Sequence, residues 1–403
     1  MTTDPGYHIA IVGGGVIGCA LALSLASRFK RIVVLEKESA PGMHASGRNS
    51  GVVHAGFNPK PGTLKARLCV EGNRRLAEYA QANGVPFRRV GTFVVARNDA
   101  EAKVIETLRQ NGVANGVPGI EIISGETLRR HEPNAIGEAA LHAPTGGIID
   151  SVALVRSLAD AARKSGIEFL FGHRVTGVQE KTDHIDLLVG AKRISAELMV
   201  NCAGLYADKL AHMLGVGRSY VILPFRGEYY SVRHSDPSLI RSMVYPAPDP
   251  AFPFLGVHLT AAVDGTVLIG PNAVPAFGRE AYSRFSFHPV EMLEQLLWKG
   301  TRQLLKDPHV RRSAMWELRR SFSKRLFAAE AAAVVRGVRP EDLRPYRAGI
   351  RAQLVSEAGQ LVEDMVLERT RRSLHLLNVV SPGMTCSIPF AEHVAGLIGE
   401  AIP

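Results

Sequence analysis

Three glycines near the start of the chain, followed by an acidic residue, have the spacing of a dinucleotide-binding site. An apolar run leads into Gly13, Gly15 and Gly18, and a second apolar run, residues 32–35, ends at Glu36. Gly13 allows a tight turn after a strand, Gly15 allows close approach of a pyrophosphate, and Gly18 allows the next helix to pack against the strand. Glu36 would accept hydrogen bonds from ribose hydroxyls, and its charge repels a 2′-phosphate, which argues against NADP.

The chain that positions this motif is expected to be compact, with two lobes whose segments alternate along the sequence. Strand, glycine turn and helix occur at both ends, so we expect the two ends to fold together around one cofactor. Residues 41–56 have no helical or strand period, and we expect a functional loop there. The expected helices are 64–81, 151–164 and 388–398, and the expected strands are 90–96, 168–171, 175–179, 198–201, 221–232, 254–271 and 374–380.

The composition indicates a folded protein of two lobes. The chain has 403 residues, of which 46% are apolar and 6% aromatic, enough for two domains of ordinary size. Its first residues carry an acid and no basic residue, and the apolar run after them breaks at Gly13, so we expect neither a secretion signal nor a membrane span. We therefore expect a cytoplasmic protein.

The four cysteines have no paired spacing, which predicts buried thiols rather than a disulfide framework or a metal centre. They are Cys19, Cys69, Cys202 and Cys386.

The net charge of +10 is partly local, because residues 299–325 hold nine Lys/Arg and two Asp/Glu. No nucleic-acid-reading module is apparent, so we expect no nucleic-acid partner. The stretch also carries large apolar residues and could form amphipathic helices that meet anionic lipid at the inner face of the cell membrane. The alternative, which we favour from sequence alone, is a solvated basic face or a rim that attracts an anionic substrate.

Residues 45–56 (ASGRNSGVVHAG) resemble the D-amino acid oxidase superfamily of FAD enzymes, and more closely its L-2-hydroxyglutarate oxidase/dehydrogenase branch. Phe57 and Asn58 depart from the tyrosines expected after this segment. The basic stretch 311–325 matches no functional motif. The resemblance continues through 60–69 (KPGTLKARLC), 201–208 (NCAGLYAD), 224–229 (PFRGEY), 245–260 (YPAPDPAFPFLGVHLT), 270–273 (GPNA), 349–353 (GIRAQ) and 381–392.

The resemblance implies an α/β fold, with a Rossmann-like FAD-binding domain interleaved with an α+β substrate domain on a mixed or antiparallel sheet. The implied FAD-binding domain is discontinuous and comprises residues 1–86, 145–215 and 345–403. The implied substrate-binding domain comprises residues 87–144 and 216–344.

The resemblance also implies FAD, held by residues from both ends and from the middle of the chain. Cys386, His54 and His44 are conceivable covalent anchors, but nothing in their spacing demands a bond, so we expect non-covalent FAD. The expected cofactor-binding residues are Gly13, Gly15, Val16, Ile17, Gly18, Glu36, Lys37, Ser46, Arg48, Asn49, Ser50, Gly51, Val52, Val175, Ala203, Gly204, Arg351, Pro382, Gly383, Met384 and Thr385.

The reaction implied is oxidation of L-2-hydroxyglutarate to 2-oxoglutarate, by hydride transfer from C2 to flavin N5 while a histidine removes the hydroxyl proton. His54 is the first candidate base and His258 the second, and a structural role remains open for each. Arg351 is expected to clamp the carboxylate next to the reacting carbon, since a guanidinium binds a carboxylate through two hydrogen bonds.

The second carboxylate of this substrate needs its own partners. Candidates are Arg226, Tyr245 and Lys65. For Arg226, an ion pair with Glu228 is an equal alternative.

Other functions remain open at this point. A glycine, sarcosine or D-amino acid oxidase would use the same fold, and a bound FAD could instead be structural or redox-sensing within a complex or at a membrane. The electron acceptor is either dioxygen or a quinone or electron-transfer chain.

Overall fold

The glycine-rich turn follows a central strand of a largely parallel sheet in the computed structural model, which describes residues 6–233, 239–248 and 256–401. Strand β1 (Tyr7–Val12) pairs in parallel with β2 (Ile32–Glu36) on one side and with β12 (Lys192–Asn201) on the other. All of β2 is buried, as expected of a parallel strand covered on both faces.

This sheet contains strands from both ends of the chain. The C-terminal strand β22 pairs in parallel with the end of β12, and an antiparallel ribbon pairs with the beginning of β12. The carboxyl ends of the parallel strands therefore meet at one edge. The remaining strands of the sheet are β9 (Glu168–Phe171), β10 (Gly177–Glu180), β11 (Ile185–Val189), β21 (Leu367–Arg369) and β22 (Ser373–Leu376).

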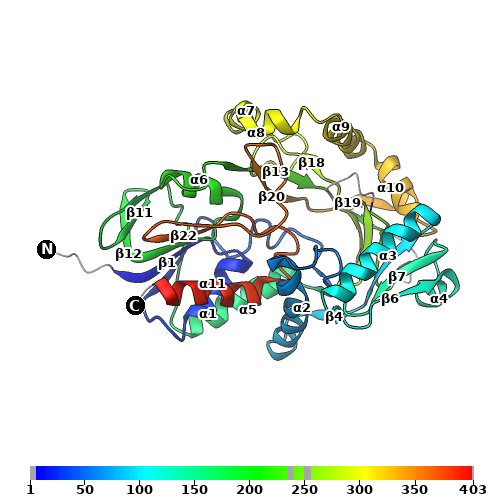
Figure 1. Cartoon of the computed structure of the whole chain (residues 1–403), viewed down its shortest axis with the longest axis horizontal. Coiled ribbons are helices and arrows are strands. Elements are labelled where there is room, and N and C mark those ends of the chain that lie inside the picture. The colour runs from blue at the N-terminus through cyan, green and yellow to red at the C-terminus, as the bar shows by residue number, and fades with distance from the viewer. Residues whose placement is uncertain (1–5, 234–238, 249–255, 402–403) are drawn as a thin grey trace.

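Four helices share an apolar core on one face of this sheet. Helix α1 contacts both α5 and α11, which is drawn in red in Figure 1, and α11 also contacts α2. Their core includes the fully buried Leu21 and Phe390, from opposite ends of the chain. The four are α1 (Val16–Leu25), α2 (Leu64–Ala82), α5 (Ser151–Lys164) and α11 (Ser387–Ala401), and α6 (Ala207–Met213) joins a separate core cluster through Leu210.

The second large sheet is mixed, as the sequence predicted. Its order is β19-β14-β17-β16-β15-β5-β7-β6, and the β15–β5 pair alone is parallel among the described pairs. The strands are β5 (Thr92–Ala96), β6 (Glu121–Ser124), β7 (Ala139–Ala143), β14 (Tyr230–Val232), β15 (Met243–Pro246), β16 (His258–Ala261), β17 (Val267–Gly270) and β19 (Leu343–Pro345).

Helices lie around this sheet and along the upper edge of Figure 1. Phe327 of α10 is fully buried in the core that the sheet forms with that helix. The helices are α3 (Asp99–Ala114), α4 (Gly125–His131), α7 (Pro289–Leu297), α8 (Lys299–Leu304), α9 (Pro308–Phe322) and α10 (Lys324–Ala332), with short 3₁₀ turns at Gly204–Tyr206 and Pro340–Asp342. Among the described residues, no helix is both long and apolar enough to cross a membrane.

Two small sheets connect the large ones. In the first, β13 (Tyr220–Gly227) lies between β18 (Val274–Pro275) and β20 (Gly349–Ser356), and Phe225 is paired with Arg351. The second holds β3 (Val52–Val53), β8 (Gly147–Ile149) and β4 (Phe87–Arg89). The first small sheet holds the backbone of Arg351 in β20. The second holds the backbone of β3, which directly precedes His54.

Some expected strand boundaries were wrong. The expected strand 221–232 is divided between β13 and β14, which belong to different sheets. The expected strand 374–380 ends at Leu376, because the residues after it turn along a cavity. The expected strand 254–271 is a hairpin of β16 and β17, and residues 249–255 lie outside the described residues.

The domain boundaries stay a prediction. The strands of the first sheet all come from the segments assigned to the FAD-binding domain. The β13–β20 pair, however, joins one strand from each assigned domain.

Two helical glycines provide a matched test of the close packing of α1 on β1. A Cβ at Gly18 would lie 1.9 Å from the carbonyl oxygen of Gly13, whereas a Cβ at Gly396 would meet nothing within 4 Å. We expect Gly18→Ala to lower the free energy of unfolding by about 3 kcal/mol, from overpacking. Gly396→Ala should raise it by up to about 1 kcal/mol, from helix propensity. Urea unfolding followed by circular dichroism measures both, and equal effects would contradict this packing.

Candidate functional site

A cavity of about 820 Å³ lies at the carboxyl ends of β1, β2 and β12 and reaches the β13–β20 pair. This volume is in the range of cofactor and ligand sites. Its walls come from the beginning, the middle and the end of the chain, as the glycine turns at both ends led us to expect.

The glycine turn leaves backbone bare at one end of the cavity. Gly13 has a φ of +110°, and a Cβ there would lie 2.5 Å from the carbonyl oxygen of Cys202. Gly15 caps α1 and lines the cavity. The N-terminus of α1 carries the positive end of the helix dipole, which favours an anion such as a pyrophosphate. The amide of Val16 donates to Ser46 Oγ at 3.0 Å, which ties the loop to the helix.

Glu36 is held at the end of β2. Its Oε2 accepts a hydrogen bond from the Gly14 amide at 2.6 Å, and its Oε1 accepts one from the Glu38 amide at 2.9 Å. Each carboxylate oxygen has a further lone pair. The fixed carboxylate can therefore accept ribose hydroxyls while it braces the glycine turn, so the residues present fit the adenosine half of a dinucleotide.

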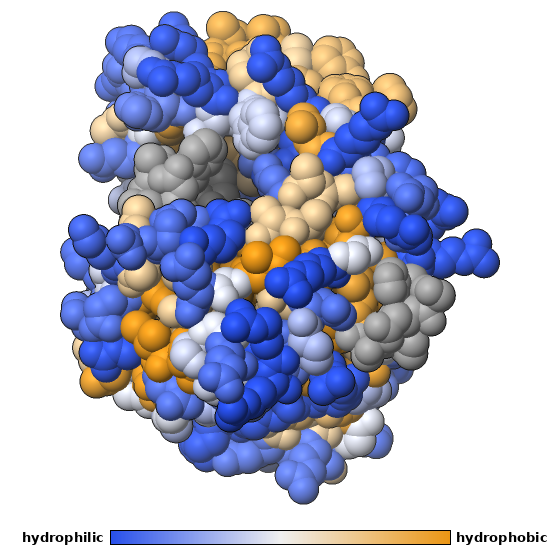
Figure 2. Space-filling view, turned by 90° about the vertical axis from the view of Figure 1, so that its right-hand side faces the viewer, coloured by the Kyte–Doolittle hydropathy of each residue, from blue (hydrophilic) through white to orange (hydrophobic). Residues whose placement is uncertain are grey.

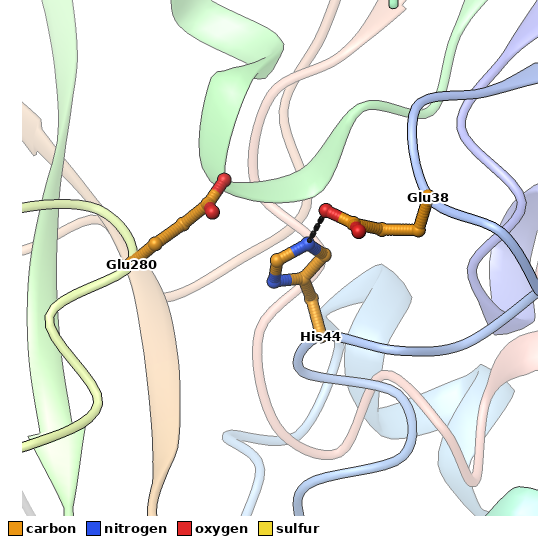
Figure 3. Close-up of side chains that lie close together, drawn as sticks. All are labelled: Glu38, His44 and Glu280. Atoms are coloured by element: carbon orange, nitrogen blue, oxygen red, sulfur yellow. Dashed lines mark hydrogen bonds and ion pairs between the residues drawn. The ribbon is translucent and has the colours of Figure 1, made fainter. Parts of the chain in front are cut away.

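A charged cluster lies at the same end of the cavity, where Lys37 and His44 line it, and Figure 3 shows Glu38, His44 and Glu280 of this cluster. Lys37 Nζ lies 2.7 Å from Glu38 and forms an ion pair with Glu280, and His44 Nε2 lies 2.9 Å from the Glu38 carboxylate. Ligand atoms of Glu38, His44 and Glu280 lie within 4.8 Å of one another, close enough for a metal ion. The Lys37 ammonium already pairs with both carboxylates, so we assign no metal here. The cluster instead joins residues 37–44 to the segment around Tyr282, whose hydroxyl lies 2.5 Å from His44 Nδ1.

The far end of the cavity is formed by His54 and the C-terminal turn. The His54 amide donates to Thr385 Oγ1 at 3.0 Å, and the His54 carbonyl accepts from Asn73 Nδ2 at 3.0 Å. The His54 ring nitrogen Nε2 lies 3.4 Å from Ser381 Oγ. Contacts from α2 and from the end of the chain thus fix this histidine.

Both candidate histidines are uncharged at neutral pH. Burial lowers the pKa of His54 to about 4, and the Arg351 charge lowers it further. Burial also lowers the pKa of His258 to about 3, although its hydrogen bond to Gly256 acts in the opposite direction. His54 and Arg351 also lower the pKa of His258, so the three groups face the same space.

His258 is oriented by two neighbours. Its ring stacks on Tyr245, with ring centroids 4.1 Å apart and planes inclined by 18°. Its Nδ1 lies 3.2 Å from the Gly256 carbonyl oxygen. In the tautomer that donates to this oxygen, Nε2 keeps its lone pair and can accept a proton.

Arg351 brings a cation to the same pocket. Burial lowers its pKa, whereas nearby Tyr229 raises it, and a guanidinium keeps its charge in proteins. Tyr229 forms a hydrogen bond with Ser50 and lines the cavity beside Tyr245. A carboxylate beside Arg351 is attracted more strongly than it would be in bulk water, because the surrounding protein has a lower dielectric constant.

Most of the sequence-derived site residues line this cavity. The exceptions are Gly18, Gly51, Lys65 and Arg226. Gly18 contacts the Gly13 turn from behind, and Lys65 Nζ donates to the backbone carbonyl of Glu363. Arg226 makes the ion pair with Glu228 that the sequence offered as its alternative, at 3.2 Å.

Several lining residues were not assigned to the site from sequence. Tyr229 lies within PFRGEY, but a lone tyrosine after a strand carries no signal of its own. The other lining residues belong to segments far from the glycine motif in sequence, and only the folding of the chain brings them to the cavity. They include Arg174, Tyr206, Lys209, Met213, Asn272 and Glu291.

Comparison with known proteins gives consistent results. An L-2-hydroxyglutarate dehydrogenase of Escherichia coli K12 is 36% identical over 395 residues, which cover 97% of this chain and 93% of that protein. The human mitochondrial L-2-hydroxyglutarate dehydrogenase is 33% identical, over 98% of this chain and 88% of its own length.

Solved structures share the fold at lower identity. The FAD-bound L-α-glycerophosphate oxidase of Mycoplasma pneumoniae superposes with a TM-score of 0.80 at 23% identity, covering 97% of this chain and 94% of that one. A glycine oxidase from Geobacillus kaustophilus gives 0.74 at 20% identity, covering 98% and 95%.

The family match spans nearly the whole chain. Residues 8–397 match the DAO family, described as FAD dependent oxidoreductases. That range includes the glycine turn, Glu36 and the C-terminal turn that enclose the cavity. The protein therefore belongs to the DAO family of FAD dependent oxidoreductases.

Proposed function

We propose that this enzyme oxidises L-2-hydroxyglutarate to 2-oxoglutarate. The names of its bacterial and human relatives support this substrate. The observation that carries the proposal is the convergence of Arg351 and two histidines with lowered pKa values in a single cavity. A 2-hydroxy acid requires this combination, because its carboxylate must be held and its hydroxyl proton removed.

The cavity residues divide into a cofactor part and a substrate part. FAD, when bound, supplies a hydride acceptor at N5. The glycine turn and Glu36 would hold its adenosine diphosphate half, and the loop 46–52 and the turn 382–385 would hold its flavin half. His54, Tyr229, Tyr245, His258 and Arg351 are then left for the substrate.

His54 is the proposed base. An uncharged imidazole can accept the hydroxyl proton of the substrate at Nε2, and burial keeps it uncharged throughout the physiological pH range. Its backbone is fixed on both sides by Thr385 and Asn73, which limits the reorganisation needed before proton transfer. His258 is the alternative base, because its Nε2 can also accept a proton.

Arg351 is the proposed clamp for the carboxylate next to the reacting carbon. Its guanidinium can donate two parallel hydrogen bonds to that carboxylate. The same charge disfavours protonation of His54 and His258. Arg351 would therefore both orient the substrate and keep the base unprotonated.

Arg226 and Lys65 are not part of this substrate pocket in our proposal. Each is engaged by other groups of the protein, Arg226 by Glu228 and Lys65 by the Glu363 carbonyl. Tyr245 and His258 stack beside the pocket and would meet the rest of the substrate.

An anaerobic titration tests the proposed substrate. The FAD-loaded enzyme should lose its visible flavin absorbance on addition of L-2-hydroxyglutarate, and much more slowly with the D enantiomer. Bleaching by glycine, sarcosine or D-amino acids instead would identify an amine oxidase. Bleaching by none of them would indicate a structural or sensing flavin. Reoxidation of the bleached enzyme by dioxygen or by a soluble quinone then distinguishes the two proposed acceptors.

His54→Gln should slow flavin reduction by roughly 10²- to 10⁴-fold, the usual contribution of a general base. FAD should stay bound, and stopped-flow absorbance measures the rate. His309→Gln, on exposed α9, is the matched control and should reduce its flavin at the wild-type rate. Near-normal reduction in His54→Gln would exclude His54 as the base.

The pH profile gives an independent test of the base. Since protonation removes the base, kcat/KM should fall as the pH drops through the lowered pKa of His54, about 4, and stay level above about pH 5. An acid limb near pH ~6.5, the ordinary histidine value, would show that the base is not a buried histidine.

Arg351→Lys should raise KM for L-2-hydroxyglutarate by roughly 10- to 100-fold, since an ammonium cannot donate the same pair of hydrogen bonds. Steady-state kinetics measure this change, with exposed Arg344→Lys as the control. An unchanged KM would refute the clamp.

A further inference from the structure

Large apolar side chains are exposed on one part of this protein far more than elsewhere. Of the seventeen such side chains among the described residues, eleven lie between residues 277 and 322. Three of them, Phe285, Val290 and Phe322, are 84%, 70% and 64% exposed. Such a concentration of exposed apolar side chains is typical of an interaction site.

Helix α7 turns its apolar face away from the protein. None of its residues is buried, and the exposed Val290, Leu293 and Leu297 share one face by their helical spacing. Glu291, on the opposite side, accepts a hydrogen bond from the Arg279 amide at 2.7 Å. A surface helix normally packs its apolar stripe inward, so this helix has the reverse orientation.

Helix α9 combines apolar and basic side chains on its exposed face. Met315 and Phe322 lie on this face, 56% and 64% exposed. The same spacing places three exposed arginines beside them: Arg311, Arg312 and Arg319. Glu317 and Arg320 lie on the inner side, where they form a buried ion pair. Basic residues next to apolar ones are typical of helices that lie in a membrane interface.

The positive charge lies on α8 and α9, whereas α7 itself carries the acids Glu291 and Glu294. Lys299, Arg302 and Lys306 add three exposed cations between α7 and α9. One of the two acids in residues 299–325, Glu317, is buried against Arg320 and offers little to offset them. A second copy of this chain would bring the same positive charge, which opposes self-association.

The helices occupy an outer edge of the molecule. Figure 1 shows α7, α8 and α9 along its top, and Figure 2 shows a patch of hydrophobic residues at the same height, beside hydrophilic ones. A purely solvated basic face, which the sequence favoured, does not account for the apolar side chains on these helices.

We propose that α7, α8 and α9 form a docking surface for an anionic lipid membrane. The exposed apolar side chains enter the boundary between headgroups and acyl chains, and the arginines and lysines contact lipid phosphates. The attachment is peripheral, because among the described residues no helix can span a membrane.

Co-sedimentation of the FAD-loaded enzyme with vesicles tests the proposal. The enzyme should bind vesicles of phosphatidylcholine mixed with phosphatidylglycerol and bind vesicles of phosphatidylcholine alone much more weakly. Raising the salt from about 0.1 M to about 1 M should release part of the bound enzyme, since the Debye length falls from about 10 Å to about 3 Å.

Two variants separate the apolar from the basic contribution. The triple variant Arg311→Gln/Arg312→Gln/Arg319→Gln should bind anionic vesicles about a hundredfold more weakly. The double variant Leu293→Glu/Leu297→Glu should lose binding at all salt concentrations. Val113→Glu on α3 and Arg129→Gln/Arg130→Gln on α4 remove comparable exposed groups elsewhere and should bind as the wild type does. Retained flavin and an unchanged melting temperature confirm that each variant is folded.

Three results would overturn the proposal. The first is no binding to anionic vesicles at low salt, and the second is equal binding by the wild type and by both surface variants. The third is a dimer in analytical ultracentrifugation that Leu293→Glu/Leu297→Glu dissociates while vesicles remain unbound. This last result would assign the surface to a second copy of the chain.

Discussion

The cavity depends on one constraint, which is that the two ends of the chain must fold against each other before the site exists. β1 and β22 lie on either side of β12, α1 packs on α11, and the His54 amide donates to Thr385. The backbone that faces the expected pyrophosphate and the backbone that faces the expected flavin therefore share one apolar core. Disruption of either end of the chain would therefore disrupt both of these backbone segments.

Burial gives the part of the cavity around His54, His258 and Arg351 its chemical character. Burial lowers the pKa values of His54 and His258 far below the physiological range, and it also opposes the charge of Arg351. An arginine, unlike a histidine, keeps its proton against this cost. The same low-dielectric environment thus yields uncharged bases beside a fixed cation, the pairing that a hydroxy acid needs.

The sequence predicted what local spacing and the family resemblance control. Gly13, Gly18 and Glu36 lie where their spacing placed them, and the helix 151–164 has the expected bounds. Contacts between segments far apart in the chain could not be predicted from the sequence. The Arg226–Glu228 pair, the position of Tyr229 and the end of β22 at Leu376 depend on how the β13–β20 pair packs against both large sheets. The basic stretch 299–325 did not reveal that the neighbouring helix α7 turns its apolar face to the outside, because helical periodicity shows which residues share a face but not where that face points.

Flavin uptake by the folded chain tests the shared cavity most directly. We predict that the purified protein holds one FAD per chain, and that in increasing urea the flavin is released in the same transition in which the helical circular dichroism is lost. A folded, colourless protein that takes up no FAD would contradict the account.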